Sequence, residues 1–350
     1  MKGAVMVDFR KPLEVRDLPD PRPGPYDAVV RVEACGICRS DWHIWYGDWT
    51  WMGLKVQLPR VLGHEFGGVV EEVGSEVRSF QPGDRVTVPF HLACGRCHYC
   101  YTGRSNICMA YGVIGVAMDG GYAQKALVPN ADVNLVRLPE NVDFLTAAAL
   151  GCRFMTAWHA IADRAGLQPG EWVAVFGVGG VGLSAVQIAS ALGARVVAVD
   201  ISDEKLERAR QEGAVAVVNA REGNLHKRIK EITDGGADVT VDALGSSAIV
   251  VPALLSLRRG GRHIQVGLTS QEDKGMSPVP IDGVVMLETE IRGSMGCPVT
   301  SYPALLAMVS SGRLDPKRLV TRTVAVEEAS QVLEQMSEFA TTGFNVITRW

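Results

Sequence analysis

The chain has 350 residues, of which 47% are hydrophobic and 21% are charged, and its formal net charge is −4. This length exceeds the size at which a single core stops growing, so two domains are expected. The slightly acidic balance offers no basic surface for nucleic acid or anionic lipid. The first ten residues lack the apolar stretch of a secretory signal, so we expect a cytoplasmic protein.

The first 150 residues are predicted to form a strand-rich domain with irregular loops. Its β-type runs are DAVVRVEACG (27–36), GGVVEEVG (67–74) and DRVTVPF (84–90), separated by Gly/Pro turns. Few segments in this part show a sustained helical period.

From about residue 172, apolar strands alternate with helical segments. The expected strands are 172–177, 194–200, 215–220, 237–245 and 262–268, and the clearest helices are 180–193 and 202–213. This alternation predicts an α/β domain with a doubly wound parallel sheet. Residues 172–194 carry no charge, but their glycines favour a buried strand and helix over a membrane span. Helices at 301–312 and 326–339 and a strand at 344–350 follow.

A dinucleotide motif opens the helix at 180–193. Gly177, Gly179 and Gly182 form G-x-G-x-x-G directly after a strand, where backbone N–H groups can approach a pyrophosphate. Asp200 ends the next strand and can accept a hydrogen bond from a ribose 2′-OH. No basic residue follows before Lys205, so nothing adjacent favours a 2′-phosphate. NAD is the predicted cofactor, against the alternative of a glycine-rich turn and a helix-capping aspartate.

Four cysteines lie close together in CGRCHYCYTGRSNIC. Cys94, Cys97, Cys100 and Cys108 can surround one tetrahedral zinc and leave no open position, which is typical of a structural site. Disulfides are disfavoured in a cytoplasmic chain. A c-type haem attachment through C-x-x-C-H is an alternative, but it leaves two cysteines unused. An iron–sulfur cluster is the other alternative.

Two further motifs carry candidate metal ligands. Cys35 and Cys38 in CGICRSDWH have the C-x-x-C spacing of a redox pair, of half a zinc site, or of two core residues. His64 and Glu65 lie in G-H-E-x-x-G-x5-G-x2-V, which runs from Gly63 to Val77.

Together with G-C-x-F-x-T at 151–156, these motifs follow one another in the order of a known family. The chain resembles the zinc-dependent alcohol dehydrogenases of the medium-chain dehydrogenase/reductase family. The resemblance covers nearly the whole chain. It implies a GroES-like catalytic domain at 1–152 with a structural-zinc lobe at about 91–111, a Rossmann NAD-binding domain at 153–293, and a return to the catalytic domain at 294–350.

The resemblance also implies a second, catalytic zinc in each chain. Its ligands would be Cys38, His64 and Cys152, and the fourth position would be left for water or alcohol. Glu65 would lie behind the metal, and Asp41 would orient the His64 ring. Cys35 is then expected to be a small buried residue.

The reaction that the resemblance implies is hydride transfer between an alcohol and NAD. Ser40 would take the alcohol proton, the nicotinamide ribose would pass it on, and His43 would deliver it to solvent. Arg39 would meet the pyrophosphate, and Thr156 would lie behind the nicotinamide. The remaining cofactor-binding residues implied by the resemblance are Gly180, Val181, Lys205 and Val266.

Two positions depart from the family pattern. Arg153 and Ala157 stand where the family commonly has glycine. A cation at residue 153 could raise the acidity of the zinc or could face the domain junction, and the sequence leaves both open. Cys297 has no evident partner and is expected to be structural.

The substrate pocket is expected to be apolar. The resemblance points to Trp49 and Phe90 as its walls, with Leu268 as a weaker candidate. We therefore predict an NAD-dependent zinc alcohol dehydrogenase acting on primary or secondary, aliphatic or aromatic alcohols. We also expect a homo-oligomer, a tetramer rather than a dimer, without nucleic-acid or membrane partners.

Two other functions remain as alternatives. A polyol dehydrogenase of the same family is the nearest, although such relatives generally have a carboxylate in place of the third ligand, Cys152. A zinc-ribbon nucleic-acid-binding protein is the alternative from a different class, and the net charge disfavours it.

Overall fold

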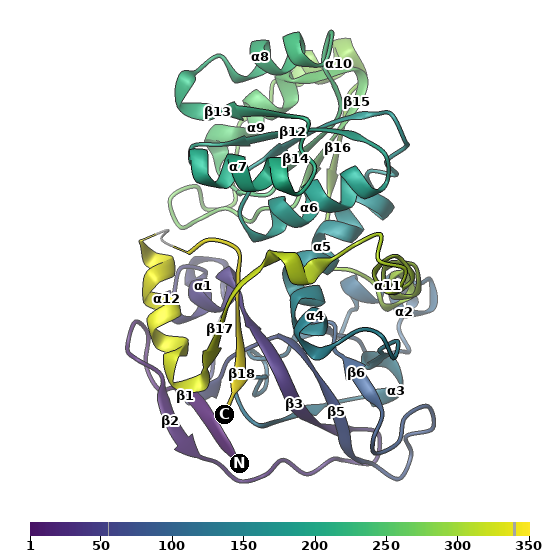
Figure 1. Ribbon diagram of the computed structural model, residues 1–350, viewed down its shortest axis with the longest axis vertical. Helices are drawn as coiled ribbons and strands as arrows, with labels where there is room; N and C mark the ends of the chain where they lie inside the picture. Colours follow the sequence, from purple (N-terminus) through teal and green to yellow (C-terminus); the bar gives the residue numbers. More distant parts are fainter. Residues whose placement is uncertain (55, 339–340) are drawn as a thin grey trace. The chain divides into compact units, whose positions relative to one another are not determined.

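The structure, a computed structural model, describes residues 1–54, 56–338 and 341–350. The chain forms two compact units, one of Met1–Met155 with Gly296–Trp350 and one of Thr156–Met295 (Figure 1). The sequence expects these changes at 152/153 and 293/294. The predicted fold class is confirmed, because one unit is rich in antiparallel strands and the other is built on a parallel sheet.

The main sheet of the first unit is centred on β3 (Ala28–Ile37). This strand pairs antiparallel with three others, and the C-terminal strand β18 is among them (Figure 1). The sheet order is β10-β6-β5-β3-β18-β17, with β9 also on β3. The other strands are β5 (Glu65–Val73), β6 (Arg85–Thr87), β9 (Lys125–Val128), β10 (Val136–Arg137), β17 (Val320–Ala325) and β18 (Phe344–Arg349).

Two smaller sheets complete this unit. One has the order β2-β1-β4, formed by β1 (Lys2–Met6), β2 (Glu14–Asp17) and β4 (Arg60–Val61), and the other pairs β7 (His91–Leu92) with β8 (Gly112–Val113). None of these strands is expected from the sequence, because each is too short to show a clear alternation of apolar and polar residues.

The helices of the first unit are short. They are α1 (Arg39–Tyr46), α2 (His98–Tyr101), α3 (Ala131–Asn134), α4 (Phe144–Ala149), α11 (Tyr302–Ser310) and α12 (Ala329–Ser337). The helix expected at 301–312 is α11. The helix expected at 326–339 begins with a 3-10 turn at Val326–Glu328 and continues as α12, and residue 339 lies outside the described residues.

The second unit is a six-stranded sheet in the order β13-β12-β11-β14-β15-β16, and every pair in it is parallel. Its strands are β11 (Trp172–Phe176), β12 (Arg195–Asp200), β13 (Ala216–Asn219), β14 (Ala237–Asp242), β15 (Leu257–Gln265) and β16 (Glu290–Gly293). Its helices are α6 (Gly180–Ala191), α7 (Asp203–Gln211), α8 (Leu225–Ile232), α9 (Ser247–Leu255) and α10 (Ile281–Leu287), and α5 (Met155–Trp158) spans the boundary residue. This is the strand order of a Rossmann domain.

The apolar strands explain why this sheet forms. The inner residues of β11, β12 and β14 are buried on both faces, which gives near-continuous hydrophobic runs rather than alternation. Phe176, Val197 and Val199 form the centre of the core with Ile229 of α8 and Ala253 of α9. The edge strand β16 is largely exposed and has no such run, so the sequence does not predict it.

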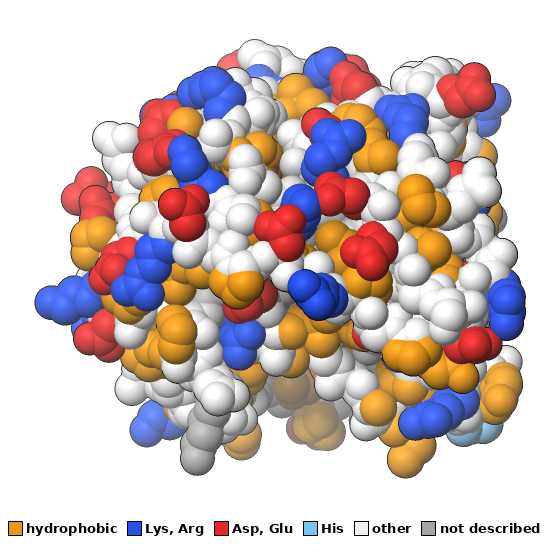
Figure 2. Space-filling view, turned by 90° about the horizontal axis from the view of Figure 1, so that it is seen from below, with side chains coloured by type: hydrophobic (Ala, Val, Ile, Leu, Met, Phe, Trp, Pro, Cys, Tyr) orange, Lys and Arg blue, Asp and Glu red, His pale blue; other side chains and the backbone are white. Residues whose placement is uncertain are grey.

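Within the described residues, no helix is both long and apolar enough to cross a bilayer. Figure 2 shows one face of the molecule, on which acidic and basic side chains are interspersed rather than gathered into a patch of one sign.

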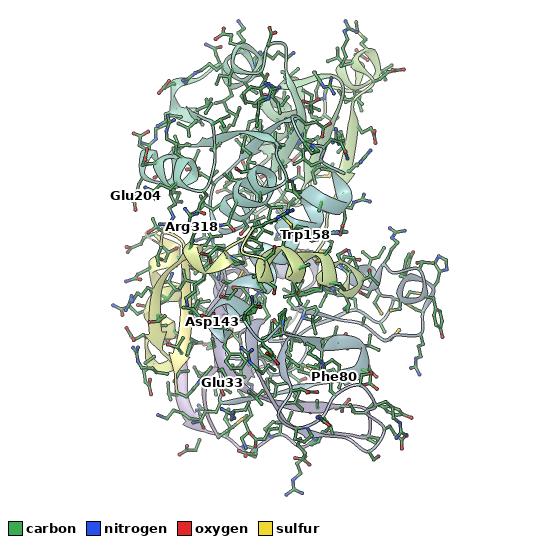
Figure 3. The ribbon with its side chains drawn as sticks, turned by 45° about the vertical axis from the view of Figure 1, so that its right-hand side comes forward. Glu33, Phe80, Asp143, Trp158, Glu204 and Arg318 are labelled. Atoms are coloured by element: carbon green, nitrogen blue, oxygen red, sulfur yellow. The ribbon has the colours of Figure 1, made fainter. Side chains whose placement is uncertain are left out.

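Asp143 begins the helical segment that leads to a predicted metal ligand (Figure 3). It is the N-cap of α4, and its side chain accepts a hydrogen bond of 2.7 Å from the Thr146 N–H. Lys317 Nζ lies 2.6 Å from the other carboxylate oxygen. Partial burial raises the pKa of Asp143, but Lys317 and Thr146 outweigh it and lower the pKa below its usual 3.8.

We expect Asp143→Ala to destabilise the protein by about 1 kcal/mol, the usual cost of removing an N-cap. Asp143→Asn keeps the capping oxygen and should cost less at pH 7. Because the pKa of Asp143 is lowered in the folded state, its charge stabilises the fold above about pH 4, and this stability disappears as the pH falls through the folded pKa. Urea unfolding at pH 7 and at pH 3 measures both effects. Equal stability of the wild type and Asp143→Ala at pH 7 would contradict the capping role.

Candidate functional site

Three segments of the first unit bring Cys38, His64 and Cys152 together. Cys38 is the N-cap of α1, directly after β3, and His64 precedes β5. Cys152 lies in a π-helical turn, Leu150–Phe154, that continues α4. One ligand atom from each of the three residues lies within 4.8 Å of the others.

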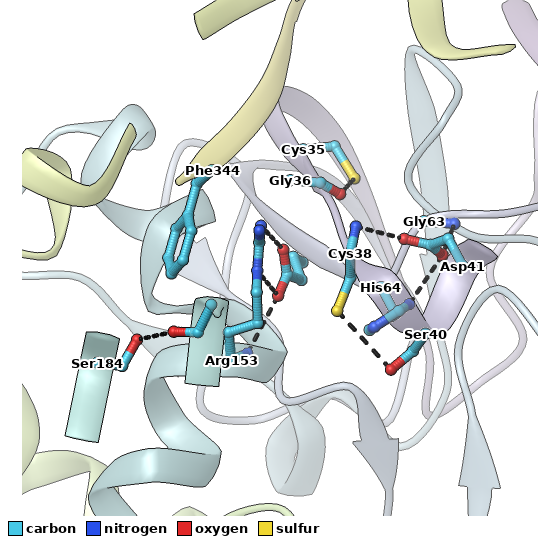
Figure 4. Close-up of polar contacts among 12 residues, drawn as sticks. Cys35, Gly36, Cys38, Ser40, Asp41, Gly63, His64, Arg153, Ser184 and Phe344 are labelled. Atoms are coloured by element: carbon cyan, nitrogen blue, oxygen red, sulfur yellow. Dashed lines mark hydrogen bonds and ion pairs between the residues drawn. The ribbon is translucent and has the colours of Figure 1, made fainter. Parts of the chain in front are cut away.

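The Asp41 carboxylate holds two of these segments in place (Figure 4). One oxygen accepts hydrogen bonds from His64 Nδ1 at 3.0 Å and from the Gly63 N–H at 3.2 Å. The other accepts from the Cys38 N–H and from the Tyr122 hydroxyl, each at 2.9 Å. Asp41 is 1% exposed, so these four bonds replace all of its contact with water.

The chemistry of the three residues fits a metal ion. With Nδ1 bonded to Asp41, His64 keeps Nε2 for a ligand, and this buried atom has no hydrogen-bond partner in the part of the chain that the structure describes. The hydrogen bond with the Cys152 thiol and the contact with His64 lower the pKa of Cys38 well below its usual value. This shift favours the thiolate, which is the form that binds a metal. The hydrogen bond to Cys38 and burial raise the pKa of Cys152. A divalent cation would replace the proton that the two sulfurs share.

Burial acts on His64 and Glu65 in the same region. It opposes the charged form of His64, but Asp41 and Cys38 outweigh it and raise the pKa of the imidazole well above its usual value. Burial also raises the pKa of Glu65 to about 7, against the attraction of Arg153. Arg153 and Glu65 form a buried ion pair. Within this unit, the group that faces the Arg153 cation is thus the Glu65 carboxylate.

Cys35 and Cys297 stay outside the ligand group. Both are fully buried, and each thiol donates to the carbonyl of the following residue at 3.6 Å, Gly36 for Cys35 and Pro298 for Cys297. Burial raises the pKa of Cys35 well above its usual value. A neutral, buried thiol of this kind is unreactive.

The four remaining cysteines converge in a lobe around α2. The ligand sulfurs of Cys94, Cys97, Cys100 and Cys108 all lie within 4.8 Å of one another. Backbone hydrogen bonds from Met109 and Cys100 lower the pKa of Cys97 to about 6, whereas burial and the neighbouring thiols raise that of Cys100 to about 12. Four sulfurs in this arrangement form a closed, structural type of site.

The nucleotide motif of the second unit has the backbone that a phosphate site requires. Gly177 has a φ of +82°, which other residues rarely adopt. A Cβ at Gly182 would lie 1.9 Å from the Gly177 carbonyl oxygen, so only glycine lets α6 approach β11 this closely. A Cβ at Gly179, the N-cap of α6, would have nothing within 4 Å, so the space above the helix start is open.

Asp200 ends β12 beside this turn. One of its oxygens accepts the Val178 N–H at 2.9 Å, and the other accepts the N–H groups of Ile201 and Ser202 at 2.8 and 3.1 Å. These bonds hold the carboxylate in one orientation next to the glycine turn. The oxygen that accepts only the Val178 N–H still has capacity for a ribose hydroxyl.

Two family models match the chain. The alcohol dehydrogenase GroES-like domain matches residues 24–140, and the zinc-binding dehydrogenase domain matches residues 180–311. An alcohol dehydrogenase of Geobacillus stearothermophilus is 38% identical over 337 residues, which is 96% of each chain. This chain belongs to the zinc-binding alcohol dehydrogenase family. The family predicted from the sequence is thus confirmed.

Other relatives of this dehydrogenase include a polyol enzyme. A sorbitol dehydrogenase of Bacillus subtilis is 35% identical over 342 residues, covering 97% of this chain and 94% of the relative. The solved structure of an alcohol dehydrogenase from Thermus sp. ATN1 matches with a TM-score of 0.92 and 35% identity over the whole of both chains. The chain is therefore an oxidoreductase, a zinc-dependent alcohol or polyol dehydrogenase.

The residues expected to move protons in this dehydrogenase lie on α1. Ser40 Oγ is 3.7 Å from Cys38 Sγ. His43 Nδ1 is 2.6 Å from Asp48 Oδ2, and its ring stacks on Trp49 with centroids 4.5 Å apart. Burial lowers the pKa of His43 despite the attraction of Asp48.

Arg39, expected to meet a pyrophosphate, contacts other groups of its own unit. Its guanidinium lies 3.9 Å from the centre of the Trp42 ring and donates to the Met336 carbonyl.

The predicted cofactor residues of the second unit are distributed around its glycine turn and beyond. Gly180 and Val181 open α6, and the Lys205 N–H in the first turn of α7 donates to Ser202 Oγ. The Val266 N–H donates to the Asp242 carbonyl at 3.0 Å. The Thr156 hydroxyl is buried and has no hydrogen-bond partner among the described residues.

The predicted pocket residues are in different surroundings. The Phe90 ring meets the His64 ring edge-on, with centroids 5.9 Å apart. Trp49 packs on His43, and its buried Nε1 has no partner within the described part of the chain. Leu268, in the second unit, is half exposed.

Sequence reasoning misses two tyrosines. Tyr122 donates to Asp41 from 81 residues away in the chain. Tyr111 remains partly exposed, but desolvation and the nearby Cys152 sulfur raise its pKa. Neither residue belongs to a motif, so the sequence offers no signal that would identify them.

Proposed function

We propose that this chain is an NAD-dependent dehydrogenase of simple alcohols, with a catalytic and a structural zinc in each chain. The observation that carries the proposal is the incomplete ligand set of Cys38, His64 and Cys152. Three ligands leave a position for substrate or water, whereas the four-cysteine lobe leaves none.

A zinc ion at the three-ligand site supplies a Lewis acid that favours loss of the alcohol proton, and NAD supplies the hydride acceptor. Cys38 and Cys152 would contribute the negative charge that holds the metal, and the bond from His64 Nδ1 to Asp41 would leave Nε2 available as the third ligand atom. The Ser40 hydroxyl, 3.7 Å from Cys38 Sγ, is our candidate to accept the alcohol proton.

His43 is suited to pass that proton to solvent. An ionised Asp48 can only accept a hydrogen bond, so His43 Nδ1 carries the hydrogen and Nε2 is the basic nitrogen. Because burial lowers the pKa of His43, the ring is neutral at pH 7 and can accept a proton.

A polyol dehydrogenase is the second candidate, favoured by the 35% identity to a sorbitol dehydrogenase. Two features support simple alcohols instead. The third ligand is Cys152 rather than a carboxylate, and the side chain beside the His64 ring is the buried Phe90, which offers an extra hydroxyl no hydrogen-bond partner.

The metal assignment predicts two zinc ions per chain by elemental analysis. Cys152→Ser should retain one zinc and the fold but lose turnover. Cys100→Ser should lower the melting temperature, because the metal of a closed site contributes to folding. Cys297→Ser, a buried cysteine outside both ligand groups, is the control and should keep two zinc ions. One zinc in the wild type, or iron in place of zinc, would contradict the assignment.

Cofactor choice depends on Asp200. A 2′-phosphate beside this carboxylate would be repelled, whereas a 2′-OH gains a hydrogen bond to a charged group. We expect kcat/KM to favour NAD strongly over NADP and Asp200→Ala to reduce that preference by about 1.5–3 kcal/mol. Asp200→Asn removes the charge but keeps one acceptor for the surrounding N–H groups, so it controls for local disorder. Equal kcat/KM for NAD and NADP in the wild type would refute the role.

The pocket predicts the ranking of alcohols. Each added methylene that fits should contribute about 0.8 kcal/mol to kcat/KM, roughly fourfold, until the pocket is full. A buried hydroxyl without a partner should cost about 1–3 kcal/mol. In a panel followed by NADH absorbance, monohydric aliphatic and aromatic alcohols should therefore exceed sorbitol, and Trp49→Ala should favour bulkier alcohols. If sorbitol exceeds every monohydric alcohol, the polyol function takes the place of this one.

A further inference from the structure

Arg153 makes a buried, forked contact with Glu65. Its backbone N–H and its Nε both donate to Glu65 Oε1, at 3.1 and 3.0 Å, and a terminal nitrogen pairs with Oε2. The side chains are 6% and 1% exposed. The arginine fork matches the two carboxylate oxygens in a way that no other basic side chain can.

Two glycines make the space for this pair. A Cβ at Gly36 would lie 2.3 Å from Glu65 Oε2 and 3.1 Å from an Arg153 nitrogen. A Cβ at Gly151 would lie 2.4 Å from Glu65 Cβ. The backbone at Gly36 therefore packs against the carboxylate, and the backbone at Gly151 packs against the base of the same side chain.

The pair thereby touches all three segments that carry the metal ligands. Gly36 lies two residues before Cys38, Glu65 directly follows His64, and Arg153 directly follows Cys152. We infer that Arg153 is a positioning residue, which assembles the three-ligand metal site by joining these segments through Glu65. The inference rests on the proposed metal at this site and adds a residue whose part in it nothing else assigns.

A fourth segment joins the same cluster. The Arg153 guanidinium lies 3.7 Å from the centre of the Phe344 ring, which is fully buried at the start of β18 (Figure 4). β18 pairs with β3 through Val346 opposite Gly36. The aromatic face holds the guanidinium in the plane that suits Glu65, so the C-terminal strand also supports the metal site.

If the Arg153–Glu65 pair only stabilised the fold, its removal would not weaken metal binding. A double variant distinguishes this possibility from a role in positioning the metal ligands. Removing one partner of a buried pair leaves an unpaired charge, whereas removing both leaves none. Glu65→Gln/Arg153→Met should therefore recover the thermal stability that Arg153→Met loses. The inference predicts that the double variant folds but still holds the metal poorly, because the fork between the segments is absent.

The readouts are zinc release to a chelator and the visible absorption of the Co²⁺-substituted protein. Arg153→Met should weaken the affinity for one of the two zinc ions by roughly 10- to 100-fold, the usual effect of removing a residue that supports a metal ligand, and should therefore release that ion to the chelator faster. In the same variant, the Co²⁺ absorption bands of the three-ligand site should shift. Arg153→Lys keeps the positive charge but not the forked contact, so relative to Arg153→Met it should restore thermal stability more than metal retention. Arg322→Met removes an arginine–glutamate pair of the same unit far from the ligands in the chain, and it should change neither readout.

Two results would overturn the inference. One is unchanged zinc release and Co²⁺ absorption in Arg153→Met. The other is a double variant that regains both stability and metal retention, which would reduce the pair to compensation of its own burial. Neither readout needs alcohol or nucleotide. A protein that holds the metal through Arg153 but oxidises no alcohol would therefore contradict the proposed function and leave this inference intact.

Discussion

The geometry of the candidate metal site depends on one buried carboxylate, that of Asp41. Its four hydrogen bonds come from the backbone of two ligand segments, from the ring of His64 and from Tyr122. A carboxylate without water is stable only when such donors surround it, since an unpaired buried charge costs several kcal/mol. The loops at Cys38 and Gly63 must therefore close on Asp41 when the unit folds. The same bonds that satisfy the charge also fix the tautomer of His64.

The candidate site of the first unit is built from side chains, whereas that of the second unit is built mainly from backbone. The metal site uses side chains in a dry interior, where each charge needs a counter-charge, so Asp41 faces His64 and Glu65 faces Arg153. The proposed nucleotide site would instead use backbone N–H groups and the absence of side chains at Gly177, Gly179 and Gly182. A motif of spaced glycines is visible in one short segment of sequence. A buried charge network joins segments that are far apart in the chain.

This difference explains what the sequence predicts. The long apolar strands of the parallel sheet, the glycine motif and the four-cysteine lobe are local patterns, and the sequence identifies each of them. The sequence does not predict the edge strand β16, because its residues are largely exposed. It does not predict α1 and α4 either, because neither is long enough to show a helical period. The sequence does not predict the role of Tyr122, because only the folded chain brings its hydroxyl to Asp41 from 81 residues away.

Trp49 shows how one side chain can serve two parts of a site. The sequence assigns it to the substrate pocket, whereas in the structure its ring stacks on His43, whose Nδ1 is bonded to the neighbouring Asp48. The stacking fixes the plane of the imidazole, and the hydrogen bond fixes its tautomer. If Trp49 also borders the substrate, a change of its size alters the fit of the alcohol and the orientation of His43 together. Phe90 contacts the His64 ring, and among the described residues no ring contact joins it to His43, so we expect substitutions there to change the proposed pocket without changing the proposed proton path.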